Sequence, residues 1–326
     1  MKQKKVNFSY MLIAFLYAFA LFLIPETFLR DRNWYLIYAT NPEEIFNRYL
    51  NNDGIISTLF NEPFFLGLNY ILKQIVNPEI IPVLLSFFIS FVLVFFMLRE
   101  VKGFWLKFIS LLYLTFIPFC FHLQLVILRQ GLPVAIFLIV MMLSKKERTP
   151  IIATFILGFI HSSFFIVFLF MLILYFIKNI KYSSQIIIIT IVSILFSASS
   201  FFVGKLLGFR QVDLYKDAIR SGSGLSFLLY SGLLCLILTR GEGFLKSYRY
   251  YSVAIVGLTV YLSLYFVSPF AGRLIASFMP FIICSLLRTN KLISYVVIIL
   301  FLLLNLFTFK DAVLSNSLTE EARFFL

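Results

Sequence analysis

The sequence is poor in charge: only 13% of its 326 residues are Asp, Glu, Lys or Arg, whereas 61% are hydrophobic and 19% are aromatic. A soluble domain carries about a quarter charged residues and is about half apolar. The composition therefore excludes a soluble globular domain, a disordered chain and a collagen-like chain. The apolar stretches are continuous and do not alternate with polar residues, which also excludes a β-barrel.

Residues that hold metals are scarce as well. The three cysteines, Cys120, Cys235 and Cys284, have no metal-ligand spacing, and the two histidines, His122 and His161, lie far apart in the sequence. Packing inside apolar segments is the simpler interpretation of the cysteines. The sequence therefore predicts no zinc site and no cofactor.

Several enzyme motifs are absent. The sequence has no Asp-x-Asp pair for a nucleotide-sugar metal, no Walker loop and no nucleophile elbow. No internal repeat is visible, which argues against a transporter built from inverted repeats. The charged residues within and beside the apolar runs thus become the main candidates for function.

Apolar runs of about the length of a bilayer crossing follow one another along the chain. They lie at 8–24, 80–98, 106–121, 123–143, 151–177, 185–203, 224–239, 251–266, 272–287 and 292–309. A helix of 18 residues rises ~27 Å, close to the hydrocarbon thickness. The run 151–177 is longer than one upright helix needs and holds His161 near its middle, so it is either one tilted helix or two short ones.

These runs predict an all-α polytopic membrane protein with a single integral membrane domain over residues 1–326. About 11 transmembrane helices result if the run 151–177 is broken, and 10 if it is one helix. Residues 1–5 are basic and no small-residue cleavage site follows the first run, so we expect a retained first helix with its N-terminus inside.

The formal net charge is +13. In the predicted topology the cytoplasmic side carries this excess of Lys and Arg, as the positive-inside rule requires, so nucleic-acid binding is not needed to explain it. The basic residues predicted outside are mostly arginines, whereas those inside are mostly lysines. Arginine suits bidentate recognition of phosphate or carboxylate; chance in a small set of residues is the alternative explanation.

The longest polar stretch, 25–78, is predicted to be an outer, periplasmic loop. Within it, the segment 62–76 has its apolar residues on one helical face and Glu62, Asn69 and Lys73 on the opposite face. This pattern predicts a short helix that lies in the membrane surface.

The segment 204–223 is predicted to be a second outer loop. It contains Arg210 among Asp and Lys residues whose spacing permits salt bridges on a solvated helix.

Arg129 is the strongest functional signal, because it lies within the apolar run 123–143. A cation at such a depth is costly and usually faces a cavity or a partner. Pro133 cannot donate to the carbonyl of Arg129, so we predict that the helix opens there. His122 lies about two turns earlier on the same predicted helix face. The alternative is an arginine that snorkels outward to the lipid head groups.

Three further sites have both a functional and a structural interpretation. His161 could accept a proton, because imidazole titrates near neutral pH, or could simply be hydrogen-bonded within the bundle. Arg273 is predicted to begin a helix on the outer side, where the helix N-terminus would add to an anion site. Arg30, Asp31 and Arg32 follow the first helix, either as an interfacial anchor or as part of an anion site.

The order of these features resembles a known family. The quoted motifs are Arg30-Asp31-Arg32, Glu62-Pro63-Phe64-Phe65 with Leu68-Asn69 behind it, Arg129-Gln130-Gly131-Leu132, His161-Ser162 and Ala271-Gly272-Arg273. Over residues 28–275 this order resembles the EpsG-like group of bacterial polysaccharide polymerases, which includes Wzy-type O-antigen polymerases. The resemblance implies a GT-C-like helical bundle in the bacterial inner membrane with an active site that faces the periplasm.

The resemblance also implies an activity. The enzyme would join glycan repeat units carried on undecaprenyl diphosphate, in the synthesis of O-antigen of lipopolysaccharide or of another surface polysaccharide. Its partners would be the lipid-linked donor and acceptor and the membrane lipid, with a chain-length regulator as a further candidate and no nucleic acid.

Residue roles follow from the same resemblance. Arginines can stabilise a diphosphate leaving group without a metal, and the candidates in order are Arg129 and Arg273, then Arg30, Arg32 and Arg210. The attacking hydroxyl needs a proton acceptor, for which His161 comes first and Glu62 second. Supporting roles go to Gln130, Asp31, Asn69 and His122. Direct attack opposite the diphosphate inverts the anomeric centre.

Two other functions remain open at the level of sequence. A transporter, such as a flippase for the same lipid-linked glycan, would also need outer arginines, but it would have pseudo-symmetric halves. A membrane O-acetyltransferase would need an acyl-donor site that is reachable from the cytoplasm, whereas the predicted inner loops are short and rich in lysine.

Overall fold

The computed structural model of the chain describes residues 7–25, 28–29, 31–206, 224–241, 243, 245, 248–266, 268, 271–288, 292–309 and 313. Every regular element in this part of the chain is a helix. The elements are α1 (Phe8–Phe22), α2 (Arg32–Thr40), α3 (Pro42–Phe60), α4 (Pro63–Lys73), the 3-10 turn η2 (Pro78–Ile80), α5 (Ile81–Glu100), α6 (Phe104–Phe116), α7 (Pro118–Leu125), α8 (Leu128–Leu143), α9 (Arg148–Leu157), α10 (Ser163–Ile177), α11 (Tyr182–Leu206), α13 (Gly224–Leu238), α15 (Arg249–Leu264), α16 (Ala271–Leu287) and α17 (Leu292–Phe309). The predicted all-α, membrane-like architecture is confirmed.

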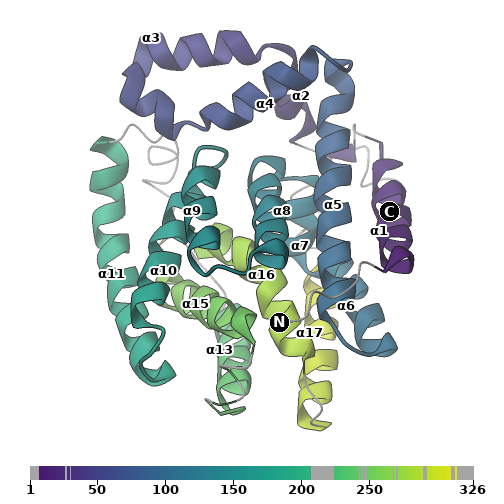
Figure 1. Cartoon of the computed structure of the whole chain (residues 1–326), viewed down its shortest axis with the longest axis vertical. Helices are drawn as coiled ribbons and strands as arrows, with labels where there is room; N and C mark the ends of the chain where they lie inside the picture. Colours follow the sequence, from purple (N-terminus) through teal and green to yellow (C-terminus); the bar gives the residue numbers. More distant parts are fainter. Residues whose placement is uncertain are drawn as a thin grey trace.

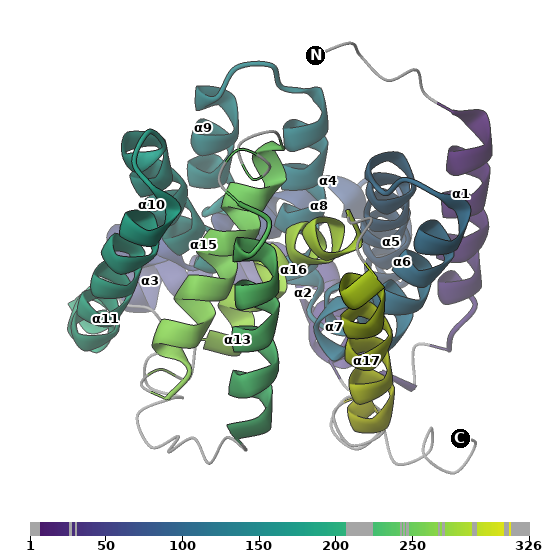
Figure 2. The ribbon, with the colours of Figure 1, turned by 90° about the horizontal axis from the view of Figure 1, so that it is seen from below.

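The helices form a bundle and a layer that caps one end of it. Figure 1 shows α3 and α4 lying across the end of the molecule, with α2 beside α4, while α5 and α11 run away from this layer. Within the bundle α15 packs along α16, α1 along α5, and α5 against α8. Figure 2 shows α16 near the middle of the bundle, and its residues are buried over nearly its whole length.

Helix length gives a partial test of the predicted crossings. Among the described residues one helix, Pro78–Glu100, is long and apolar enough to cross a membrane by itself, with a mean hydropathy of 2.8. Two bent pairs, Gly54–Phe60 with Pro63–Lys73 and Phe104–Phe116 with Pro118–Leu125, pass the same test only when each pair is taken together. The other apolar helical stretches of the described residues have 10–17 residues, among them Tyr182–Ser197 within α11 and Ser294–Phe309 within α17. The number of crossings and the GT-C-like arrangement therefore stay predictions.

The helix predicted over 62–76 is present as α4, which ends three residues earlier. It meets the second half of α3 at a bend of 75°. Phe64 and Ile71 are more than half exposed, whereas Asn69 is buried. The two predicted faces therefore exist, with the polar stripe turned toward the protein. Whether α4 lies in the membrane surface stays a prediction, and of the second outer loop, 204–223, only the part within α11 is described.

The long run 151–177 forms two helices, α9 and α10, so the broken interpretation is correct. Arg148 Nε donates a hydrogen bond of 3.2 Å to the hydroxyl of Tyr175, and Glu147 pairs with Lys178. The start of α9 therefore lies beside the end of α10, and the two helices form an antiparallel hairpin. Its corner, residues 158–162, includes His161.

The preceding segment differs from the prediction, because the runs 106–121 and 123–143 form three helices, α6, α7 and α8. α6 ends before Pro118, and Gln124 Nε2 donates at 2.7 Å to the carbonyl of Leu114, which Pro118 cannot satisfy. The chain bends again after α7, so Arg129 lies in the first turn of α8 and His122 lies on α7. The two residues do not share one helix face.

The helix also does not open at Pro133 as predicted. α8 continues through Pro133 to Leu143 without a break, although Pro133 has no N–H to donate to the carbonyl of Arg129. Arg129 is thus placed by the start of α8 and not by a break within it.

Gly131 permits the tight turn from α7 into α8. A Cβ at this position would lie 2.1 Å from the carbonyl oxygen of Leu123, which is backbone and cannot swing aside. We expect Gly131→Ala to destabilise the protein by about 1–3 kcal/mol, the usual range for overpacking, and to displace the start of α8. The measurement is the midpoint of thermal unfolding in detergent.

Gly232→Ala is the matched control, because a Cβ there would meet no described atom within 4 Å. This helical position on α13 should tolerate alanine or gain slightly from its higher helix propensity. Equal midpoints for Gly131→Ala and the unsubstituted protein would contradict the steric argument.

Candidate functional site

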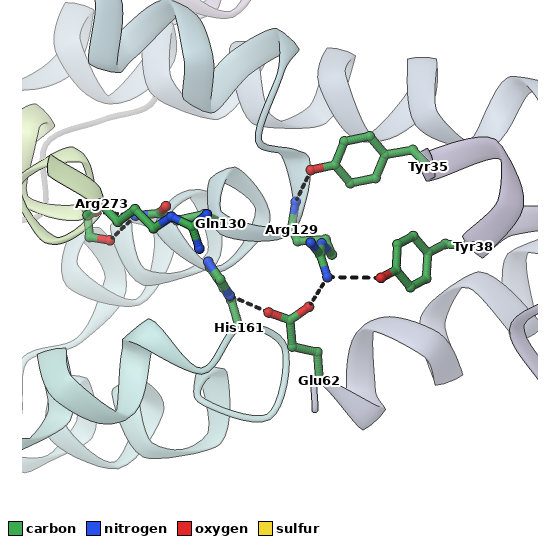
Figure 3. Close-up of polar contacts among 8 residues, drawn as sticks. Tyr35, Tyr38, Glu62, Arg129, Gln130, His161 and Arg273 are labelled. Atoms are coloured by element: carbon green, nitrogen blue, oxygen red, sulfur yellow. Dashed lines mark hydrogen bonds and ion pairs between the residues drawn. The ribbon is translucent and has the colours of Figure 1, made fainter. Parts of the chain in front are cut away.

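Three charged or titratable side chains from distant parts of the chain meet at the capped end of the bundle (Figure 3). Glu62 Oε2 lies 2.7 Å from Arg129 Nη1, and Glu62 Oε1 lies 2.5 Å from His161 Nδ1. Glu62 comes from the corner between α3 and α4, Arg129 from the first turn of α8, and His161 from the corner between α9 and α10. We call these three residues the Glu-Arg-His cluster.

The sequence Glu62-Pro63-Phe64-Phe65 explains how α4 reaches the hairpin corner. Pro63 occupies the first turn of α4, where no backbone donor is needed. The backbone N–H of Phe64 donates to the carbonyl of Phe159 at 3.0 Å, and the two rings lie 5.2 Å apart. This contact joins the α3–α4 corner to the α9–α10 corner and brings Glu62 to His161.

Glu62 has an unusual backbone. Its φ is 64° and its ψ is 46°, and it is the only non-glycine residue with positive φ among those described. Such a conformation costs a non-glycine residue roughly 1–3 kcal/mol and persists only where the surroundings impose it. The strained backbone therefore belongs to Glu62, the residue whose carboxylate contacts both Arg129 and His161.

Burial differs among the three side chains. The Glu62 and His161 side chains are 8% and 6% exposed, whereas the Arg129 side chain is 32% exposed. A guanidinium at 2.7 Å favours the charged form of the Glu62 carboxylate. The cluster therefore presents one accessible cation, supported from behind by a buried carboxylate and imidazole.

The orientation of His161 matters for its chemistry. Because Nδ1 faces the carboxylate, a neutral imidazole with its proton on Nδ1 has a free lone pair on Nε2. A carboxylate on one ring nitrogen fixes the tautomer and stabilises the cation that forms when the other nitrogen takes a proton. The pair is thus arranged to accept a proton.

Gln130 connects this site to the centre of the bundle. Its Nε2 donates to the carbonyl of Arg273 at 2.5 Å and to Ser277 Oγ at 2.9 Å. Arg273 lies in the first turn of α16, so the predicted helix start is confirmed. Since Gln130 follows Arg129 directly, α8 places Arg129 in the cluster and holds the start of the helix that carries Arg273 (Figure 3).

The remaining predicted site residues are distributed differently. Asn69 is buried and donates to the carbonyl of Phe65 within its own helix at 2.8 Å. Arg32 is buried as the first residue of α2, with Asp31 just before it, and His122 lies against Phe121 on α7. Arg30 and Arg210 lie outside the described residues. The predicted roles of these six residues therefore stay predictions.

Two tyrosines of α2 belong to the site and escaped the reasoning from sequence. Tyr38 accepts a hydrogen bond of 3.2 Å from Arg129 Nη1, and Tyr35 accepts one of 3.5 Å from the backbone N–H of Arg129. Their i, i+3 spacing in a polar stretch was the available signal, but the chain has 17 tyrosines and nothing in the pattern singles these two out.

Comparisons with known proteins complete the description. Among the described residues no group of three His, Cys, Asp or Glu side chains is placed to hold a metal ion. No curated protein and no solved structure matches the chain. The model of the EpsG family, whose members are Wzy-like polysaccharide polymerases, matches residues 10–321. Because this match covers nearly the whole chain, the protein belongs to the EpsG family.

Proposed function

We propose that this membrane protein joins glycan repeat units carried on a polyprenyl diphosphate, with undecaprenyl diphosphate as the carrier, at the periplasmic face of the bacterial inner membrane. The observation that carries the proposal is the Glu-Arg-His cluster, which combines an accessible guanidinium with a buried carboxylate–imidazole pair. Membership of the EpsG family supports a polymerase-type activity.

The surroundings of the cluster favour a ligand with negative charge. Three helices, α4, α8 and α10, begin at or within two residues of the cluster residues, and Gln130 of α8 holds the first turn of α16. A helix N-terminus carries a partial positive charge, which favours phosphate even where the first N–H groups are already paired, as those of Phe64 and Arg129 are here. Arg129 and Arg273 add two full charges in the first turns of α8 and α16. We assign both arginines to the diphosphate of the donor.

The reaction follows from this assignment. A hydroxyl of the acceptor sugar attacks the anomeric carbon of the donor glycan, and a new glycosidic C–O bond forms. The bond between that carbon and the diphosphate oxygen breaks, and the leaving polyprenyl diphosphate takes the electron pair. Arg129 and Arg273 stabilise the charge that gathers on it, as preorganised donors do at a developing oxyanion. The hydroxyl proton goes to His161 Nε2.

Glu62 orients His161 and stabilises the imidazolium that forms during transfer. One attack from the face opposite the diphosphate inverts the anomeric centre and needs only one base. A flippase for the same lipid would need an anion site, and only one driven by a proton gradient would also need a proton acceptor. The contact between Glu62 and His161 therefore favours glycosyl transfer over transport that is not driven by protons.

Reconstitution in liposomes with one defined lipid-linked repeat unit tests the proposal. We expect a ladder of lengthened glycans, release of one polyprenyl diphosphate for each bond formed, an inverted linkage, and no change on addition of a chelator. A transporter would move the lipid between leaflets without lengthening the glycan. Liposomes that transport but never lengthen, or lengthening that stops with the chelator, would contradict the proposed reaction.

A further inference from the structure

We infer that α2 is a positioning element for Arg129, and that Tyr38 orients its guanidinium toward the diphosphate of the donor. The inference rests on the proposed function, because it assigns a purpose to contacts made at the proposed diphosphate site. It concerns residues that act through Arg129 and not on the substrate itself.

Tyr38 makes two kinds of contact with the Arg129 side chain. Its hydroxyl accepts a hydrogen bond of 3.2 Å from Nη1, and its ring lies 5.0 Å from the guanidinium carbon. The hydrogen bond fixes the direction in which the Nη1–H bond of Arg129 points. The second contact is a cation–π interaction, which holds the guanidinium over the Tyr38 ring. Tyr35, one turn earlier, contacts the backbone N–H of Arg129. α2 therefore holds both the backbone and the guanidinium of this residue.

The tyrosines are themselves held firmly. Phe65 of α4 lies edge-on to both rings, at 6.3 Å from Tyr35 and 5.9 Å from Tyr38. Tyr38 also packs against the cluster of Ile45, Tyr49 and Leu66. Three helices of the capping layer therefore fix Tyr38 in place before any ligand binds.

Arg129 needs such support because its side chain reaches an exposed position. An arginine has several rotatable bonds, and each that is frozen only on binding reduces affinity. Glu62 and Tyr38 both contact Nη1, which anchors one side of the guanidinium and leaves about a third of the side chain exposed. Burial raises the pKa of Tyr38 to about 12, against the opposing effect of Arg129, so the hydroxyl stays neutral.

Two substitutions of Tyr38 separate its hydroxyl from its ring. Tyr38→Phe keeps the ring and loses the hydrogen bond to a charged donor, so we expect kcat/KM for the lipid-linked donor to fall about tenfold. Tyr38→Leu also loses the cation–π contact, and we expect a fall of about a hundredfold. The KM for a separately labelled acceptor should stay the same, and the thermal midpoint of Tyr38→Phe should match that of the unsubstituted protein.

Tyr70 on α4 offers the matched control, because it is 46% exposed and makes no described contact with Arg129. Tyr70→Phe and Tyr70→Leu should leave donor kcat/KM unchanged. Binding of the labelled donor gives a further readout: in an Arg129→Lys background, Tyr38→Phe should weaken it by less than twofold, because the two changes remove one shared interaction.

Three results would overturn the inference. They are a Tyr38→Phe variant within twofold of the unsubstituted protein, equal losses for donor and acceptor, and full additivity with Arg129→Lys. An unsubstituted protein that lengthens no glycan would instead contradict the proposed function. The two failures are therefore distinguishable in one set of measurements.

Discussion

Arg129→Gln is expected to abolish long glycan chains, with a loss of about 10³-fold in kcat/KM for the lipid-linked donor. This corresponds to roughly 4 kcal/mol, the upper part of the range for removing one preorganised donor from a developing oxyanion. Arg129→Lys should lose almost as much, because an ammonium cannot bind a diphosphate with two parallel hydrogen bonds. Sizing of the products from the defined lipid-linked unit measures both effects.

Loss of Arg129 also leaves the Glu62 carboxylate, 8% exposed, without its partner at 2.7 Å. Breaking such a pair destabilises a protein by about 3–5 kcal/mol, so inactivity alone would be ambiguous. The double variant Glu62→Gln with Arg129→Gln removes both charges and should recover the thermal midpoint without recovering activity. Arg148→Gln, an exposed arginine that contacts Tyr175, is the matched control. A normal chain-length ladder from Arg129→Gln would remove this residue from the mechanism.

The sequence alone identifies Glu62, Arg129 and His161 as candidate site residues. It does not predict that the three side chains contact one another. The run 151–177 exceeds the length of a crossing and holds a histidine at its middle, so a break near His161 was predictable. The contact between His161 and Glu62 that results from this break was not predictable. The hairpin that points His161 at Glu62 depends on the packing of α9 along α10 and on Phe64 meeting Phe159, and contacts between residues so distant in sequence leave no local pattern.

The dependence on contacts between helices also explains why the helices around Arg129 were predicted wrongly. Hydropathy is continuous across 106–143, because a bend between apolar helices changes no residue's polarity. Two residues permit the two bends. Gly131 lets α8 approach the carbonyl of Leu123, and Gln124 satisfies the carbonyl of Leu114 that Pro118 leaves free. Both are tertiary contacts. One helix running from His122 through Arg129 was therefore the natural expectation, and it placed on one helix face two residues that lie on α7 and α8.

His161→Gln is expected to slow glycosyl transfer by about 10³-fold while the donor still binds. Removal of a general base usually costs 10²–10⁴-fold, and the diphosphate contacts of Arg129 and Arg273 do not require the imidazole. Glu62→Gln should cost about 10²-fold, because the amide still reaches His161 but no longer stabilises an imidazolium. Single-turnover rates measured at saturating donor separate these losses from any change in binding.

The double variant distinguishes a dyad from two independent residues. If Glu62 acts through His161, adding Glu62→Gln to His161→Gln should slow transfer little further, because groups that act as a unit are not additive. Glu147→Gln is the matched control, since this carboxylate is 66% exposed at the other end of the α9–α10 hairpin. Full activity in His161→Gln would transfer the role of base to Glu62. Multiplicative losses would mean instead that the 2.5 Å contact orients neither partner for the reaction.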